Sequence, residues 1–319
     1  MQSGFWGKLR RPFFVMAPLA DVTDQAFRRV IAKYGKPDVL WTEFVSADGL
    51  FLGGREALMP DLAYTEEERP IVAQFFTSKP ELMEKAGALA RELGFDGVDI
   101  NMGCPDRTIE KQGAGAALIK NPSLAKELIF AAKQGAGDLP VSVKTRVGYN
   151  RIELEEWLPV LLETKPAALT VHARTRKEMS LVPARFEHVT RAVELRGELS
   201  PETLILGNGD LKDIADARAK VSETGADGAM LGRAIFGNPW LFAEKVPTTG
   251  EKLRVMVEHT KLYEELLGGK KSFAVMKKHY KAYVNGFDGA KELRMELMEA
   301  KDAAEVGAIT EAFLKHTTQ

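Results

Sequence analysis

The sequence predicts a parallel (β/α)8 TIM barrel, an α/β fold, followed by a small C-terminal helical bundle. Eight short apolar runs occupy about the first 230 of the 319 residues. Helix start and stop signals separate most of these runs. From residue 251 onward only helical periodicity remains. A doubly wound open sheet is the alternative for such alternation, but the first run lacks the Gly-x-Gly-x-x-Gly motif of dinucleotide-binding sheets, which favours the barrel.

The eight predicted strands are rich in aliphatic and β-branched residues, as expected for strands covered on both faces. They are residues 13–17, 39–41, 71–76, 97–100, 141–144, 168–172, 203–207 and 228–231. Helices are predicted between them at 25–34, 80–93, 122–135 and 215–224, with a short one at 46–52. Four more are predicted at 253–267, 273–284, 290–298 and 303–314. We therefore expect a barrel domain over 1–244 and a helical domain over 245–319.

Composition excludes several classes of protein. The formal net charge is −1, so any nucleic-acid-binding surface must be local. No stretch approaches the roughly 20 apolar residues of a membrane span, and the N-terminal residues lack the pattern of a secretion signal. With one cysteine, the chain fits a reducing cytoplasm, where we expect a monomer. Histidines and carboxylates do not occur at metal-ligand spacing, so no metal is predicted.

Polar side chains end five of the predicted strands in succession: Gln74, Asn101, Lys144, His172 and Asn208. In a barrel these would converge on one mouth, where such folds place their chemistry. The alternative is that each satisfies only its local backbone.

Cys104, the only cysteine, follows the fourth strand directly. An isolated cysteine is commonly an inert small apolar residue. Here Asn101, Gly103 and Pro105 surround it rather than aliphatic residues, which favours a reactive thiol.

Two glycine turns follow the last two strands, Gly207-Asn208-Gly209-Asp210 and Gly232-Arg233. Backbone N–H groups at such turns bind phosphate, and the loops after strands seven and eight are the usual phosphate site of a barrel. Lys144 and Arg146 at the end of the fifth strand also require an anionic partner. That partner is either a ligand such as a reduced flavin or a carboxylate such as Asp99 or Glu43.

Positive charge in the helical domain is concentrated in the segment 270–281, which reads KKSFAVMKKHYK. A solvated lysine face is the usual explanation for such a run. Contact with RNA phosphates is the alternative, and the interleaved His279, Tyr280 and Tyr283 favour it slightly because aromatic rings stack on unpaired bases.

In order and spacing, these segments resemble the tRNA-dihydrouridine synthase family. The resemblance runs from Met16 into the helical domain. Its most specific part is Asn101-Met102-Gly103-Cys104-Pro105, followed by the segment 113–118. The other matching segments are 16–24, 42–44, Gln74, 144–146, 172–176, 208–210 and 232–234. Two departures stand out, Leu19 in place of the usual Met and the loop 179–186, which lacks the family's Tyr and Gly.

The resemblance implies reduction of the C5–C6 double bond of specific uridines in tRNA, with FMN as cofactor and NADPH as electron donor. It implies Cys104 as the catalytic proton donor. Flavin contacts are implied at Pro18, Leu19, Ala20, Gln74, Lys144, His172, Asn208, Gly209, Asp210, Gly232 and Arg233. We predict substrate contacts at Asn101, Arg146, Arg176, Lys277, Lys278 and Lys281.

Two other functions remain open from the sequence. A flavin barrel acting on a free pyrimidine, of the dihydroorotate or dihydropyrimidine dehydrogenase type, needs neither the helical domain nor the lysines. A non-enzymatic RNA-binding protein on a decayed barrel would not take up flavin.

Overall fold

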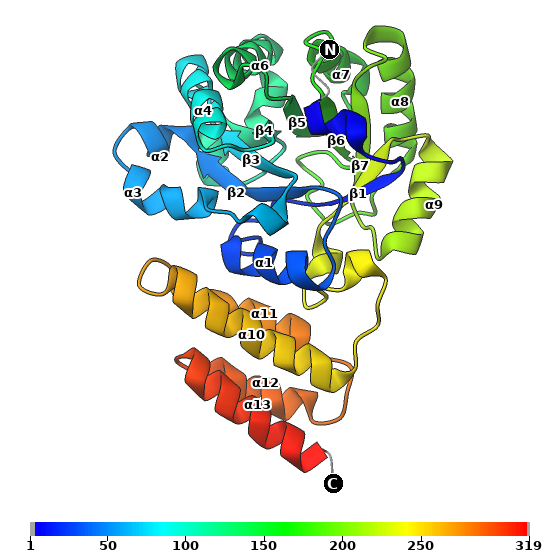
Figure 1. Cartoon of the computed structure of the whole chain (residues 1–319). Helices are drawn as coiled ribbons and strands as arrows, with labels where there is room; N and C mark the ends of the chain where they lie inside the picture. The colour runs from blue at the N-terminus through cyan, green and yellow to red at the C-terminus, as the bar shows by residue number, and fades with distance from the viewer. Residues whose placement is uncertain (1–3, 318–319) are drawn as a thin grey trace.

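The computed structural model describes residues 4–317 and shows an eight-stranded parallel sheet that curls into a barrel (Figure 1). The strands are β1 (Phe13–Met16), β2 (Leu40–Ser46), β3 (Ile71–Phe76), β4 (Gly97–Met102), β5 (Val141–Arg146), β6 (Ala168–His172), β7 (Leu204–Asn208) and β8 (Gly228–Leu231). Their order is β1-β8-β7-β6-β5-β4-β3-β2. A parallel bridge between Val15 and Val39 brings β1 to β2. The predicted barrel is thereby confirmed.

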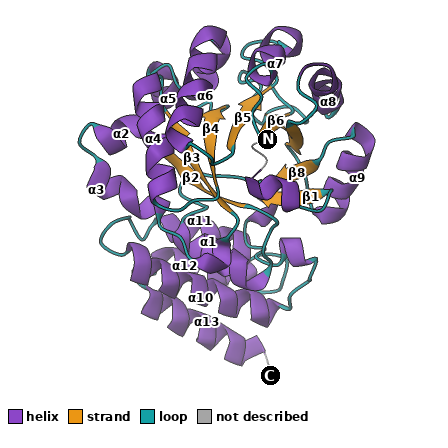
Figure 2. Ribbon diagram, turned by 45° about the horizontal axis from the view of Figure 1, so that its top comes forward, coloured by secondary structure: helices purple, strands orange, loops and turns teal. Residues whose placement is uncertain are grey.

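Helices surround the barrel (Figure 2). They are α1 (Gln25–Tyr34), α2 (Ala47–Phe51), α3 (Arg55–Leu58), α4 (Pro80–Glu92), α5 (Arg107–Lys111), α6 (Pro122–Ala136), α7 (Leu154–Leu162), α8 (Glu187–Leu199) and α9 (Ile214–Thr224). Capping residues or prolines mark the first turn of several of these helices. The Asp24 carboxylate accepts from the Phe27 N–H at 2.9 Å, and Pro occupies the first turn of α4 and α6.

Side-chain alternation along the strands divides the barrel into an outer and an inner core. Outward-facing residues such as Val98, Ile100 and Val143 belong to the core shared with the helices. Inward-facing residues such as Val15, Trp41 and Leu206 form a smaller apolar cluster inside the barrel. Strand β2 extends beyond the predicted run 39–41, because Thr42 and Glu43 interrupt the apolar pattern without ending the strand.

Four C-terminal helices lie together beneath α1 (Figure 1). They are α10 (Thr249–Leu267), α11 (Val275–Tyr283), α12 (Ala290–Glu299) and α13 (Ala303–Thr317). Their core includes Ala26 and Val30 of α1 together with Trp240. The helical domain therefore packs on one particular helix of the barrel, and we call this contact the junction.

An ion-pair cluster also crosses the junction. The Lys271 Nζ lies 2.8 Å from Glu43 Oε2 and 2.7 Å from Asp61 Oδ1. Glu43 Oε1 also accepts from the backbone N–H of Asp21, in the loop after β1. A lysine of the helical domain is therefore bound to the second strand of the barrel and, through it, to the first loop.

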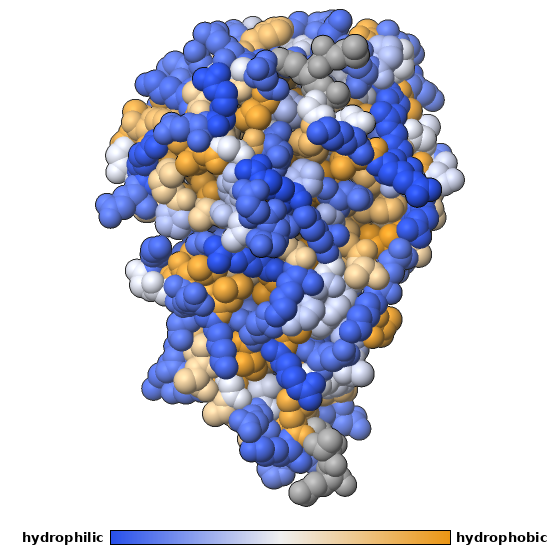
Figure 3. Space-filling view, in the orientation of Figure 1, coloured by the Kyte–Doolittle hydropathy of each residue, from blue (hydrophilic) through white to orange (hydrophobic). Residues whose placement is uncertain are grey.

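The face seen in Figure 3 is mostly hydrophilic, with hydrophobic residues scattered among the polar ones. Among residues 4–317, no helix has the length and apolar character needed to cross a membrane.

Candidate active site at the carboxyl ends of the strands

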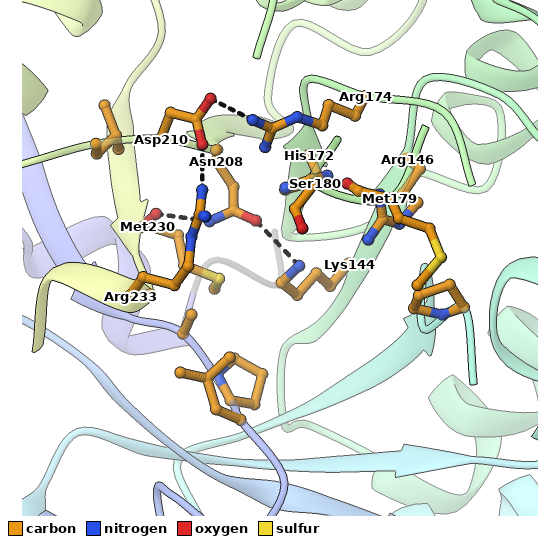
Figure 4. Close-up of a pocket in the computed structure, with 17 residues that line it drawn as sticks. Lys144, Arg146, His172, Arg174, Met179, Ser180, Asn208, Asp210, Met230 and Arg233 are labelled. Carbon is orange, nitrogen blue, oxygen red and sulfur yellow. Dashed lines mark hydrogen bonds and ion pairs between the residues drawn. The ribbon is translucent and has the colours of Figure 1, made fainter. Parts of the chain in front are cut away.

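A cavity of about 300 Å³ opens at the carboxyl ends of the strands (Figure 4). Its lining carries four cationic side chains and one carboxylate, a formal excess of +3. The lining residues are Ala17, Pro18, Leu19, Pro105, Lys144, Arg146, His172, Arg174, Met179, Ser180, Asn208, Gly209, Asp210, Leu211, Met230, Gly232 and Arg233. The cavity thus has the size and the charge to receive an anionic ligand.

Asp210 organises the end of the cavity formed by β7 and β8. Its carboxylate is bound to the guanidinium groups of Arg174 and Arg233 and accepts the Ala184 N–H at 2.9 Å. The hydrogen bond from Arg174 is the main reason that the pKa of Asp210 is lowered. In Figure 4 the two arginines approach the carboxylate from different sides. Asp210 therefore orients two cations beside the turn predicted to bind phosphate.

Gly209 provides the close approach that this turn requires. Its φ is +124°, and a Cβ at this position would lie 2.8 Å from the Ala184 Cβ. Residues other than glycine rarely adopt this conformation. The backbone at Gly209 therefore faces the cavity without a side chain.

Lys144 binds neither carboxylate that the sequence offered as its partner. Its Nζ donates to Asn208 Oδ1 at 3.2 Å, and the Asn208 amide donates in turn to the Met230 carbonyl at 2.7 Å. Glu43 pairs with Lys271 instead. Burial, followed by repulsion from Arg146, lowers the pKa of Lys144 to about 8. The cation is thus held in the mouth by a neutral amide.

His172 ends β6 with its ring against the cavity. Its Nδ1 is buried and has no hydrogen-bond partner among the described residues. Burial, followed by repulsion from Arg146 and Lys144, lowers the pKa of His172 well below its usual value. The imidazole is therefore neutral near pH 7 and retains hydrogen-bonding capacity toward a ligand.

Arg146 and Arg176, the two arginines predicted as substrate contacts, bind other parts of the protein. Arg146 donates to the carbonyls of Gly103 at 2.7 Å, Thr175 at 3.1 Å and Met179 at 3.2 Å. Arg176 forms a two-pronged pair with Glu110 of α5. Arg146 therefore connects the Cys104 turn to the loop 179–186. This loop contributes Met179 and Ser180 to the cavity lining.

Cys104 lies half-buried in the turn after β4, next to Pro105 of the cavity lining. Its side chain packs against the small cluster of Phe76, Ile109 and Ala114. Its carbonyl accepts from the Ala116 N–H at 2.9 Å. Burial raises the pKa of the thiol above its usual value, so Cys104 is protonated at neutral pH.

Gln74 and Asn101 point into the barrel and bind each other and their surroundings. The Asn101 oxygen accepts from the N–H groups of Gly103 and Cys104. Its Nδ2 donates to Gln74 Oε1 at 3.2 Å. Gln74 has no solvent exposure. Contacts of these two amides with flavin or uracil stay predictions.

The three lysines of α11 that were predicted to contact substrate have different surroundings. Lys277 donates to the Met298 carbonyl at 2.5 Å, and the Lys278 Nζ lies 3.7 Å from Asp21 Oδ2 of the barrel. Lys281 is exposed. The expectation that His279, Tyr280 and Tyr283 stack on bases is wrong, because all three have no solvent exposure. They face the inside of the helical domain and the junction.

Sequence reasoning gave no role in the site to Arg174 and Glu110, and it named Asp99 only as an alternative partner of Lys144. Asp99 lies inside the barrel, and its signal was a carboxylate within an otherwise apolar strand. Arg174 is 2% exposed and pairs with Asp210. Glu110 pairs with Arg176 across a sequence separation of 66 residues, which no local pattern reveals. No group of three or more His, Cys, Asp or Glu side chains suited to a metal occurs within residues 4–317.

Solved structures with similar folds are distant in sequence. An old yellow enzyme homologue from Zymomonas mobilis matches with a TM-score of 0.50 and 16% identity, over 73% of this chain and 89% of its own. Histamine dehydrogenase from Rhizobium sp. 4-9 matches with a TM-score of 0.53 and 12% identity, over 78% of this chain and 48% of its own. These likenesses support the barrel fold.

Sequence relatives cover nearly the whole chain. A probable tRNA-dihydrouridine synthase 2 of Bacillus subtilis (strain 168) is 42% identical over 98% of this chain and 97% of its own length. A probable tRNA-dihydrouridine synthase of Staphylococcus aureus (strain COL) is 40% identical over 98% and 96%. The family model for dihydrouridine synthase (Dus) matches residues 15–318. The chain therefore belongs to the dihydrouridine synthase family, a family of flavin-dependent oxidoreductases.

Proposed function

We propose that the protein reduces the C5–C6 double bond of specific uridines in tRNA, with FMN as its flavin and NADPH as the electron donor. Family membership supports the reaction. The observation that carries the proposal is the cationic cavity at the strand ends with the Cys104 turn directly beside it. A free-pyrimidine reductase would not account for relatives that match the helical domain as well as the barrel and are named for tRNA.

The residues of the cavity fit a flavin mononucleotide. Its phosphate dianion matches the bare backbone at Gly209 and Gly232 beside Arg233. Lys144 and the unpartnered Nδ1 of His172 suit the polar edge of the flavin ring. Pro18, Leu19, Asn208 and Asp210 also line the cavity. Together with Ala20 and Gln74, which lie outside the lining, they complete the set that we assign to the cofactor. When bound, the flavin supplies to C6 of the uracil a hydride taken from NADPH.

Cys104 supplies the other hydrogen. Its raised pKa keeps the proton on Sγ near pH 7, and a general acid must be protonated before it can act. Transfer of this proton to C5 of the uracil completes the reduction and leaves a thiolate, which solvent reprotonates. Arg146 binds the Gly103 carbonyl and so holds the turn that carries the thiol.

We assign the helical domain, residues 245–319, to the tRNA. The target base must leave its stack to reach the mouth, so the surrounding RNA needs its own binding surface. Lys278 and Lys281 are exposed on α11 and are suited to phosphate contacts. Asn101, Arg146, Arg176 and Lys277 are already engaged within the protein. We propose that the first three support the mouth and that Lys277 supports α11.

The test uses purified protein, NADPH and three substrates: unmodified tRNA transcript, free uracil and orotate. We expect a yellow protein with one FMN per chain, and oxidation of its reduced flavin only when tRNA is present. Mapping of dihydrouridine in the product then identifies the position. Oxidation of reduced flavin by uracil or orotate, without tRNA turnover, would replace this proposal with a free-pyrimidine reductase.

A further inference from the structure

Asp99 is a buried carboxylate that the proposed chemistry does not use. It lies at the middle of β4, faces the barrel interior and is 1% exposed. Ser142 Oγ donates to its Oδ1 at 2.5 Å, and Gln74 Nε2 donates to its Oδ2 at 2.5 Å. Both donors come from the neighbouring strands, at positions in register with Asp99. A buried charge with neutral partners is costly, and burial raises the pKa of Asp99 to about 6. At pH 8 the side chain is therefore an ionised carboxylate.

A continuous line of hydrogen bonds runs from Asp99 to the Cys104 turn. Gln74 donates to Asp99, and the other end of the same amide, Oε1, accepts from Asn101 Nδ2 at 3.2 Å. The Asn101 oxygen then accepts from the N–H of Gly103 at 3.1 Å and of Cys104 at 2.9 Å. We call this line the amide relay.

The amide relay has a direction, because each side-chain amide has one donor end and one acceptor end. An ionised carboxylate only accepts, so Gln74 must turn its NH2 toward Asp99 and its oxygen toward Asn101. Asn101 must then donate to Gln74 and present its own oxygen to the turn. The backbone N–H groups of Gly103 and Cys104 require an acceptor, which the Asn101 oxygen provides. The carboxylate at one end and the turn at the other therefore favour the same direction.

We propose that Asp99 is a positioning residue for Cys104: as an obligate acceptor it sets the direction of the amide relay and thereby holds the Asn101 oxygen against the Cys104 turn. The inference rests on the proposed function only in taking Cys104 as the proton donor. It concerns hydrogen-bond direction rather than charge, and this distinction can be tested.

Ser142 makes the test specific. In Asp99→Asn the new amide can still accept from Gln74 if its NH2 donates to Ser142 Oγ, whose hydroxyl already lies 3.3 Å from the Val98 carbonyl and can donate to it. In Ser142→Ala the Asp99 carboxylate still accepts from Gln74. The double variant combines Asp99→Asn with Ser142→Ala. The amide at position 99 then has no Ser142 hydroxyl to bind, so its NH2 is free to face Gln74. In that arrangement the donor and acceptor ends of Gln74 and Asn101 exchange. The two substitutions should therefore be strongly non-additive.

The first readout is alkylation of Cys104 by iodoacetamide at pH 8, which reports one site because the chain has one cysteine. We expect the double variant to react about tenfold faster than the product of the single effects, because the turn no longer holds the thiol in its pocket. The second readout is single-turnover reduction of tRNA uridine, which should fall by at least about tenfold beyond that product. Thermal unfolding and bound flavin show whether each variant is folded.

A further substitution in the double variant provides the rescue. Gln74→Glu restores an obligate acceptor between the amide at position 99 and Asn101, so the slow alkylation of the parent should return even if flavin contacts suffer. Additive single effects, or a triple variant as reactive as the double one, would overturn the proposal. A parent protein that does not reduce tRNA uridine would refute the proposed function instead, while the alkylation series would still decide the role of Asp99.

Discussion

The mouth of the barrel and the junction beneath it both bury imidazole nitrogens that have no hydrogen-bond partner in the described chain. At the mouth, His172 faces a cavity among cations. At the junction, His259 and His279 contact each other edge to face, with ring centroids 4.7 Å apart. Phe27 lies 5.4 Å from the first ring and 5.2 Å from the second.

The surroundings of these unpartnered imidazole nitrogens differ between the two regions. At the junction aromatic rings cover both imidazoles, and both are fully buried. Their unmet hydrogen bonds are a cost of packing two domains together. At the mouth the free nitrogen opens onto a cavity with excess positive charge. An unpartnered histidine therefore indicates a ligand only where space and complementary charge accompany it.

The largest effect should come from the mouth. Cys104→Ala should lower single-turnover reduction of tRNA uridine by about 10²–10⁴-fold, because the proton for C5 is lost. Flavin content and reduction of the flavin by NADPH should match the parent, since the thiol takes no part in either. A rate within a few-fold of the parent would remove Cys104 from the reaction.

A smaller effect is expected at the phosphate end of the cavity. Arg233→Ala should weaken FMN binding by about 1.5–3 kcal/mol, the scale of a charged hydrogen bond. Dialysis followed by absorbance of retained flavin measures it. Arg218→Ala, which removes a similar exposed arginine paired with Glu244, is the matched control and should retain its flavin. Full occupancy in both variants would place the phosphate elsewhere.

The buried histidines of the junction should make the folding stability of the protein depend on pH. Burial lowers the pKa of His279 to about 3, so the folded state keeps the ring neutral while the unfolded state protonates it below pH 6.5. Stability is therefore full above pH 6.5 and falls with decreasing pH, by about 1 kcal/mol per pH unit for each such histidine.

His279→Phe keeps an aromatic ring and removes the titration, so its loss of stability between pH 6.5 and pH 5 should be about 1–2 kcal/mol smaller than that of the parent. Urea unfolding at several pH values measures this difference. A variant whose stability falls as steeply as that of the parent would contradict the assignment.

The smallest effect concerns the lysines of α11. Lys281→Ala should lower the slope of log affinity for tRNA against log salt by about 0.7–0.9 if Lys281 contacts one phosphate. Lys277→Ala is the internal comparison, because its Nζ is bound to Met298, and it should leave the slope unchanged. Equal slopes in parent and Lys281→Ala would identify Lys281 as an ordinary solvated lysine.

Regular features of this protein could be predicted from the sequence, because their causes are local. The eight strands follow from short aliphatic runs, and the flanking helices follow from residues such as Asp24 and Gly225 that cap them. Convergence of Asn101, Lys144 and His172 on one mouth follows from parallel strands alone. The helices α7 and α8 were not predicted: Pro159 lies inside α7, and no side chain caps the start of α8.

The partners of charged and polar groups depended on the tertiary structure. Lys144 had two carboxylates available by sequence and binds Asn208, while Glu43 binds Lys271 from the other domain. His279 and Tyr280 lie within a lysine-rich segment yet are buried. The direction of the amide relay likewise depends on β3, β4 and β5 being neighbours in the sheet. Hydrogen bonds and ion pairs act over a few ångströms, so residues distant in sequence become partners only after the fold has brought them together.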